Sequence, residues 1–148
     1  MADEKQLQYS FICSRGTLDG AYPALVLALN SVRLGHKVTV FFTFFGLDVI
    51  KKGGAGKLKF YPPGPMGAIP GMPIMASSMM RRMVDDANIP DVPTMLELCQ
   101  IEGVKFVACH MTMDMMKYTT DDLIDDVEIM TAEQFLKQAA DCHINMFT

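Results

Sequence analysis

The chain lacks tryptophan altogether and has no surplus of basic residues. Its 148 residues include 13 lysines and arginines against 17 aspartates and glutamates, a net charge of −4 with an isoelectric point near 5.2. A protein that binds nucleic acid needs a basic face to replace the counterions around phosphates. The isolated pairs Lys51–Lys52 and Arg81–Arg82 do not make such a face and are interpreted as solvated surface. The composition therefore argues against a nucleic-acid partner.

The cysteines lack the close, regular spacing of a disulfide framework or a zinc ribbon. There are four of them: Cys13, Cys99, Cys109 and Cys142. Residues 1–9 are polar and acidic, unlike a secretory signal peptide. A protein that is not exported keeps its thiols reduced, so the sequence predicts a cytoplasmic protein with free cysteines.

Charge is missing from residues 60–76, which contain five prolines and three glycines. The uncharged run continues to Met80, long enough to raise the question of a membrane span. Each proline removes a backbone donor that lipid cannot replace, which argues against a spanning helix and leaves peripheral association open. Residues 53–76 are predicted to form a Gly/Pro-rich lid or partner-docking loop.

Strand-type and helix-type segments alternate along the chain, and half of its residues are hydrophobic. This is enough apolar surface for one domain with its own core, and no boundary divides it. The alternation predicts a mainly parallel sheet with helices on both faces, after a flexible segment at 1–8. The expected strands are residues 9–13, 37–43, 104–109, 127–130 and 142–147, and the expected helices are residues 21–34, 46–52, 77–87, 94–102, 111–116, 119–124 and 131–140.

Residues 21–34 form the most apolar of the predicted helices, since residues 24–29 leave almost no polar face. A helix of this kind is usually covered on both sides. The sheet supplies one cover and a neighbouring subunit is the natural second one, so the sequence predicts a homo-oligomer. Eleven of the 14 methionines fall between Met66 and Met116, where they are interpreted as packing of an irregular core or a subunit interface.

Cys109 ends the clearest buried strand, 104–109, and precedes a helix-like segment rich in methionine. The residue is therefore expected at the carboxyl edge of the parallel sheet, where open α/β sheets bind their ligands. Backbone amides at the start of a helix favour a thiolate over a thiol. A lone buried cysteine is nevertheless more often inert than reactive, so position alone leaves both interpretations open.

Three blocks of sequence carry a resemblance to a known family. They are residues 13–24 (CSRGTLDGAYPA), residues 40–47 (VFFTFFGL), and residues 103–109 (GVKFVAC) followed by Met111, Met113, Asp114 and Met116. Together they resemble the DsrE/DsrF/DsrH-like sulfur-relay family, and within it the DsrE-like subgroup. The resemblance implies a single domain with a flavodoxin-like, three-layer α/β/α fold, oligomers, and a cysteine that carries sulfane sulfur as a persulfide, here Cys109. Phe45 in place of tryptophan and Lys117 in place of glycine depart from the pattern.

The function that this resemblance predicts is that of a sulfur carrier or sulfurtransferase that accepts and passes on sulfane sulfur at Cys109. Sulfur transfer requires a thiolate that attacks an outer sulfur and later yields it to another thiolate. The implied partners are protein thiols, on a TusA-like carrier or a rhodanese. No cofactor is predicted, because Gly16 and Gly20 match neither a dinucleotide-binding nor a P-loop spacing.

Three side chains are candidate auxiliaries to Cys109. His110 follows it directly and would stabilise a thiolate if the turn brings the two groups together. Cys99 lies on the preceding helix, and a strand of about 18 Å against about 6 Å of returning helix puts it too far away for a disulfide within one subunit. Cys99 is therefore interpreted as a packing residue or a contact to another subunit. Cys13 ends a strand that a flavodoxin-like order would place beside that of Cys109, so it either shares the rim or points into the core.

A non-catalytic binding module is the alternative function. Residues 109–116 combine a thiolate, an imidazole and methionines, which suits a soft metal such as Cu(I), and Cys142–His143 is a second Cys-His pair. The methionines and the proline-rich loop would equally suit a hydrophobic partner. Methionines this close together more often pack a core, so no metal site is predicted.

Overall fold

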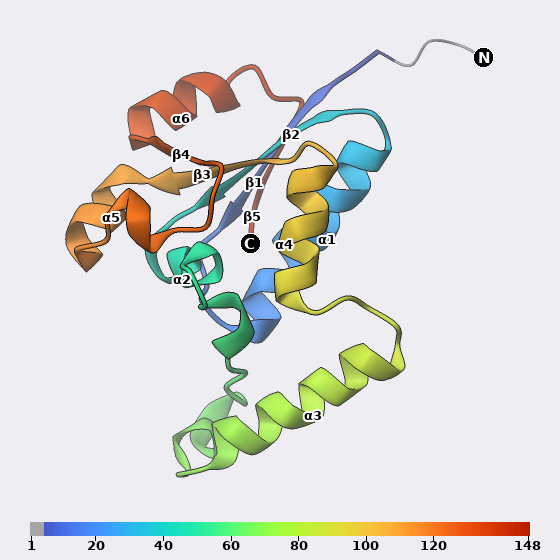
Figure 1. The fold of residues 1–148 in the computed structure, drawn as a ribbon, viewed down its shortest axis with the longest axis vertical. Helices are drawn as coiled ribbons and strands as arrows, with labels where there is room; N and C mark the ends of the chain where they lie inside the picture. Colours follow the sequence, from blue (N-terminus) through green and yellow to red (C-terminus); the bar gives the residue numbers. More distant parts are fainter. Residues whose placement is uncertain (1–4) are drawn as a thin grey trace.

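A five-stranded sheet with helices on both faces organises residues 5–148, the part of the chain that the computed structural model describes (Figure 1). The strand order is β4-β3-β2-β1-β5, and every neighbouring pair is parallel. The strands are β1 (Gln8–Cys13), β2 (Lys37–Phe42), β3 (Lys105–Cys109), β4 (Val127–Met130) and β5 (Ile144–Phe147).

Figure 1 shows the sheet between α1 and α4 on one side and α6 on the other. This arrangement confirms the predicted three-layer α/β/α fold. The longer helices are α1 (Leu18–Arg33), α3 (Met72–Asp86), α4 (Val92–Ile101), α5 (His110–Met116) and α6 (Ala132–Ala139), and the shorter ones are α2 (Leu47–Ile50) and the 3-10 turns η1 (Phe44–Gly46), η2 (Ala55–Lys57), η3 (Gly64–Ala68) and η4 (Thr120–Asp122).

The sheet is buried on both faces, so two separate hydrophobic clusters form. The larger cluster lies under α1 and α4 and contains Phe42 of β2. The smaller one consists of Phe41, Val107, Cys109 and Phe135. Successive side chains on a strand point to opposite faces, which sends Phe41 and Phe42 into different clusters. Burial on both faces also explains why β2 and β3 read as continuous apolar runs.

α1 begins at Leu18, three residues before the predicted start. Thr17 caps the helix, and its hydroxyl accepts a hydrogen bond from the Gly20 amide at 3.2 Å. Pro23 consequently lies inside the helix, in its second turn. The second cover of this apolar helix is α4 of the same chain. Part of the surface that predicted a subunit contact is therefore buried within the chain, and the homo-oligomer stays a prediction.

α3 begins at Met72. The prediction of an irregular segment over residues 53–76 is therefore wrong for residues 72–76, which are helical. Pro73 falls in the first turn, where a proline costs no hydrogen bond, and Gly71 before it has a φ of 82°. η2 and η3 add short turns within residues 53–71. No helix within residues 5–148 combines the length and the apolarity needed to cross a bilayer.

The N-terminal segment predicted to be flexible spans residues 1–8. Residues 1–4 lie outside the described part of the chain, and Gln8 is the first residue of β1. Gln8 pairs with Lys37 in the parallel ladder to β2. The prediction is therefore wrong at residue 8, because the sheet extends one residue further than the apolar run suggests.

Gly46 lies where the turn after β2 touches the end of β1. A Cβ atom at this position would collide with the carbonyl oxygen of Cys13. We expect Gly46→Ala to lower the free energy of unfolding by about 2 kcal/mol, since the added methyl group would have to displace the backbone of Cys13. Gly56→Ala is the matched control, because nothing lies within 4 Å of its Cβ position. Urea denaturation of both variants checks this, and equal stabilities would contradict the close contact at Gly46.

Candidate functional site

Cys109 lies at the carboxyl end of β3, where it is also the N-cap residue of α5. Its side chain is only 3% exposed and belongs to the small cluster under α6. The rings of Phe41 and Phe135 in that cluster stack at 4.2 Å with an interplanar angle of 11°. Phe135 is the buried residue that α6 contributes. The thiol is thus placed at the sheet edge but is covered by an aromatic pair.

Thr112 fastens the helix after Cys109 to the neighbouring strand end. Its side chain is fully buried, and its hydroxyl oxygen accepts a hydrogen bond from the Phe44 amide at 3.0 Å. The hydroxyl of Thr43 lies 3.3 Å from it. Phe44 has a φ of 49°, a conformation that is rare outside glycine. We did not predict Thr112 as a site residue, and its position three residues after Cys109 was the one available signal.

The prediction that the strand of Cys13 lies beside the strand of Cys109 is wrong, whereas the alternative that Cys13 points into the core is confirmed. β2 lies between β1 and β3. Cys13 pairs with Phe42, which pairs with Ala108, so these three side chains face the larger cluster. Cys109, one residue further along, faces the opposite side of the sheet. Burial raises the pKa of the Cys13 thiol to about 11, so it stays protonated at neutral pH.

Cys99 and Cys142 also lie away from Cys109. Cys99 is buried on α4, where its thiol donates to the Leu25 carbonyl at 3.6 Å, and burial raises its pKa to about 12. Cys142 precedes β5 at the amino edge of the sheet, opposite to the edge of Cys109. Its thiol donates to the Gln138 carbonyl, and partial burial raises its pKa. All four cysteines are free thiols.

His110 lies on the exposed surface of α5. Its Nδ1 is 3.3 Å from a carboxylate oxygen of Asp114, one turn further along the same helix. The pair holds the imidazole along the helix. The contact that the structure shows for the His110 imidazole is therefore the carboxylate of Asp114.

The residues proposed for a soft metal are divided between different surfaces. Met113 is buried in the larger cluster, whereas Cys109 faces the smaller cluster across the sheet. Met111 and Met115 point outward, being 57% and 52% exposed. Within residues 5–148, no group of three His, Cys, Asp or Glu side chains is arranged to hold a metal ion. The side chains of residues 109–116 therefore do not point toward one shared metal position.

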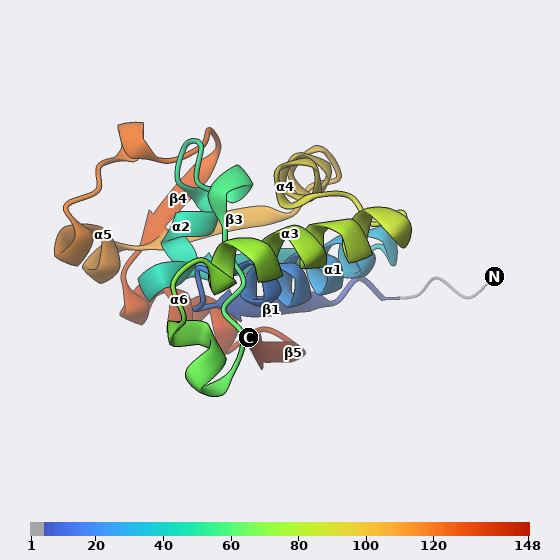
Figure 2. The same ribbon diagram turned by 90° about the horizontal axis from the view of Figure 1, so that it is seen from below.

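The proline-rich segment lies far from Cys109 in the same chain. Figures 1 and 2 show α5, which follows Cys109, and α3 as separate parts of the molecule. Residues 60–76 precede and begin α3 at the far end of the long axis. A lid over Cys109 would therefore have to come from a neighbouring subunit.

Comparisons with known proteins identify the family of this chain. Residues 5–147 match the family described as DsrE/DsrF/DrsH-like. This chain belongs to that family. The resemblance predicted from three sequence blocks is thereby confirmed.

Relatives of this DsrE/DsrF/DrsH-like chain match it along its length. The sulfur carrier protein DsrE2 of Allochromatium vinosum is 34% identical over 159 residues, which cover 97% of this chain and 99% of that protein. YrkE of Bacillus subtilis is 29% identical over 157 residues, covering 97% and 98%. The crystal structure of the ychN protein from E. coli matches with a TM-score of 0.64 at 15% identity, covering 97% of this chain and 100% of the other. The last comparison shows a shared fold.

An exposed apolar rim lies on and beside the helix after Cys109 in this DsrE-like chain. It consists of Phe44 and Phe45 from η1 together with Met111 and Met115 from α5. The hydrogen bond from the Phe44 amide to Thr112 holds η1 against α5. Phe45, one of the two predicted departures from the family pattern, is 64% exposed. Large apolar side chains gathered beside a candidate site favour contact with another protein.

Lys117, the second departure from the family pattern, ends α5 in a left-handed conformation with φ 60° and ψ 32°. Glycine adopts this conformation without the Cβ clash. We expect Lys117→Gly to raise the free energy of unfolding by about 1 kcal/mol. Lys137→Gly, within helix α6, should lower it by about 1 kcal/mol. Chemical denaturation measures both, and a destabilised Lys117→Gly would show that the lysine side chain matters more than its backbone.

Proposed function

We propose that this protein is a sulfur carrier in a sulfur relay, and that Cys109 accepts sulfane sulfur and passes it to a thiol of a partner protein. The observation that carries the proposal is the position of Cys109, at the carboxyl edge of the sheet and the start of α5. The kinship with a protein named as a sulfur carrier supports a role in sulfur relay.

The transfer requires one thiolate to displace another. The Cys109 thiol gives up its proton, and its sulfur attacks the outer sulfur of a donor persulfide. A new S–S bond forms on Cys109 while the S–S bond of the donor breaks, and the donor leaves as a thiolate that takes up the proton. Delivery is the same exchange in the opposite sense, with the acceptor's thiolate as the attacking group. No outside oxidant or reductant is needed.

Contrast with the other cysteines supports Cys109 as the carrier. Burial raises the pKa values of Cys13 and Cys99 to about 11 and about 12, so neither thiol supplies much thiolate at neutral pH. Cys142 lies at the other edge of the sheet. Cys109 is the cysteine that borders the exposed apolar rim, defined by Phe44, Phe45, Met111 and Met115.

Protein partners are part of the proposal. The apolar rim beside Cys109 suits a partner that brings its own thiol to this edge, and the family resemblance suggests a TusA-like carrier or a rhodanese. A homo-oligomer and a cytoplasmic location complete the proposal and stay predictions. The burial of Cys109 suits a carrier, because a covered persulfide loses less sulfur to free thiols.

Intact-mass analysis tests the proposal directly. The purified protein is incubated with polysulfide or with thiosulfate and then separated from the reagent. We expect a mass increase of one sulfur atom per chain that dithiothreitol removes. Failure of the native protein to gain sulfur from either reagent would refute the carrier role. Copper bound at a fixed ratio after purification would instead favour the soft-metal alternative.

A further inference from the structure

Basic residues are concentrated in a segment that forms much of a projection at one end of the molecule, although α3 itself ends in Asp85 and Asp86. Six lysines and arginines lie between Asp48 and Asp85, with no aspartate or glutamate among them. They are Lys51, Lys52, Lys57, Lys59, Arg81 and Arg82. The rest of the chain keeps only seven of the 13 basic residues against all 17 acidic ones. An acidic protein thus concentrates positive charge in this one segment.

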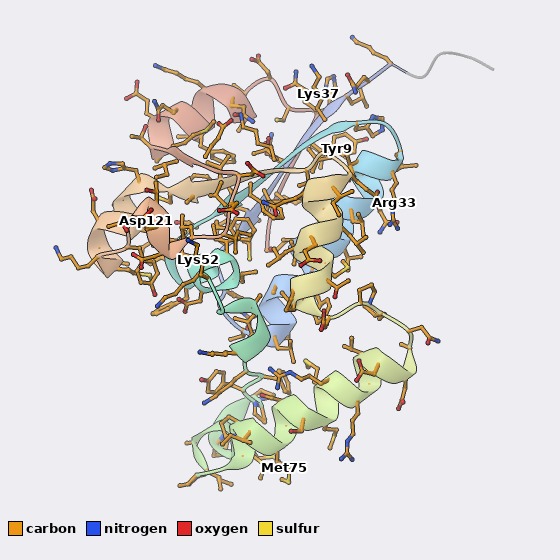
Figure 3. All side chains as sticks on the ribbon, viewed as in Figure 1. Tyr9, Arg33, Lys37, Lys52, Met75 and Asp121 are labelled. Atoms are coloured by element: carbon orange, nitrogen blue, oxygen red, sulfur yellow. The ribbon has the colours of Figure 1, made fainter. Side chains whose placement is uncertain are left out.

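The far end of the projection is an exposed apolar surface built by η3 and α3. We call it the apolar tip. Met79 and Met83, one turn apart on α3, are 61% and 65% exposed, and α3 buries only Ser77. Figure 3 shows Met75 at this far end of the molecule, with Lys52 nearer the sheet. A groove of about 350 Å³ crosses the apolar tip, and its wholly apolar lining includes Phe60, Met66, Met75, Met79 and Met83.

Hydrogen bonds bring the basic residues on both sides of the apolar tip together at its base. The Arg81 guanidinium donates to the Leu58 carbonyl, and the Ser77 hydroxyl oxygen accepts from the Phe60 amide at 2.7 Å. Lys57 and Lys59 flank Leu58 in the chain, as Arg82 follows Arg81. The uncharged residues 60–80 therefore project beyond a basic base formed by residues 57, 59, 81 and 82.

We propose that the apolar tip is a membrane-surface anchor, which enters the headgroup and acyl boundary of an anionic bilayer while the basic base contacts lipid phosphates. Apolar side chains that project beyond a cluster of lysines and arginines have the arrangement of interfacial anchors. Anionic lipid attracts basic residues close to a membrane surface. The proposal concerns a surface separate from Cys109 and does not depend on sulfur transfer.

The prolines of the apolar tip favour this occupant. Residues 60–76 contain five prolines, none of which has a backbone N–H to desolvate. Irregular backbone is not tolerated deep in hydrocarbon, so the anchor lies at the interface and does not span. A second copy of this chain is the competing occupant of the apolar tip, and the fluorescence measurement below distinguishes it from a membrane.

Co-sedimentation with lipid vesicles tests the anchor. The native protein is mixed with vesicles of phosphatidylcholine alone, or of phosphatidylcholine with 30% phosphatidylglycerol. We expect binding to the anionic vesicles, weaker binding at high salt, and little binding to the neutral ones. Absence of binding to anionic vesicles, or equal binding to both kinds, overturns the proposal.

Paired variants locate the binding surface. Lys57→Gln with Arg82→Gln should weaken binding to anionic vesicles about 30-fold, since each basic residue near the surface contributes to the attraction. Lys105→Gln with Lys137→Gln removes two positive charges outside the basic base. This control should change binding to anionic vesicles only slightly, through the net charge of the protein. Met75→Gln with Met79→Gln should also weaken binding, whereas Ile101→Gln, at a residue 80% exposed on α4, should not. Equal losses in the paired variants would overturn the assignment to the apolar tip.

The absence of tryptophan allows a direct measurement of insertion. Met75→Trp places a single indole on the apolar tip, and its fluorescence should shift to shorter wavelength with anionic vesicles. Ile101→Trp is the control and should keep its spectrum. If the Met75→Trp spectrum changes only with protein concentration, in step with oligomer mass by light scattering, a second copy covers the tip and the anchor is refuted.

Discussion

Replacing Cys109 with serine should abolish sulfur loading. The serine hydroxyl is not acidic enough to supply an anion at neutral pH, and an oxygen cannot hold a sulfane sulfur that a thiol then removes. The side chain is almost the same size, so we expect the free energy of unfolding to change by about 1 kcal/mol or less. The variant and the native protein are loaded with polysulfide side by side, and intact mass reports the added sulfur.

Cys99→Ser and Cys13→Ser are the matched controls for this experiment. Both thiols are fully buried and their pKa values are raised by burial, to about 12 and about 11. Each control removes one buried sulfur from the other side of the sheet and should leave loading at Cys109 unchanged. If Cys109→Ser loads sulfur as fully as the native protein, Cys109 is not the carrier. If a control loses loading instead, the carrier is that residue.

Phe135→Ala should make Cys109 react much faster with an alkylating reagent. Phe135 closes the small cluster that leaves Cys109 only 3% exposed, and it is the buried residue of α6. Losing a buried phenylalanine removes about 3 kcal/mol of packing, which raises the population of the locally open state about 100-fold. The alkylation rate, followed by mass, should rise accordingly at neutral pH.

The control is Leu136→Ala, which truncates an exposed side chain on the same helix. Its alkylation rate should match that of the native protein. Phe135→Leu keeps most of the packing and should give an intermediate rate. Cys99 serves as an internal reporter, because it becomes reactive only if the whole core opens. A rate unchanged by Phe135→Ala would mean that Cys109 is reached by a route other than past α6.

Both predictions bear on how a buried thiol exchanges sulfur with another protein. The apolar rim of Phe44, Phe45, Met111 and Met115 lies beside α5, while α6 covers the sulfur from the other side. A partner that binds the rim could bias α5 or α6 toward the open state. Faster loading in Phe135→Ala together with faster loss to dithiothreitol would support this division between docking and covering.

Local patterns determined most of the elements. The apolar runs of β2 and β3 predict buried strands, since a sheet covered on both faces needs no polar alternation. Thr131 and Gln134 form a capping box at the start of the predicted helix 131–140, with mutual hydrogen bonds that involve four consecutive residues. The place of Cys109 at the end of a strand and the start of a helix also followed from its neighbours in the chain. Such features depend on contacts within a few residues, which the sequence contains.

Strand order was decided only by the tertiary structure. Because β2 separates β1 from β3, Cys13 and Cys109 sit on different strands that do not touch, and the register turns them to opposite faces. A shift of one residue in the register would reverse that outcome. The partner of a strand is chosen by long-range packing of α1, α4 and α6, and no local pattern in the sequence reports it.

The position of α3 could likewise not be predicted from the sequence. Its methionines are interpreted from the sequence as packing of an irregular core or a subunit interface, but only Ser77 of α3 is fully buried, Met80 packs partly against the larger cluster, and Met79 and Met83 remain exposed. The sequence by itself determined the alternating elements, the cysteine at the sheet edge and the uncharged run at 60–80. The tertiary structure decided which thiols are buried on which face and that the uncharged run stands apart from the sheet, because both depend on which surfaces far apart in the chain meet.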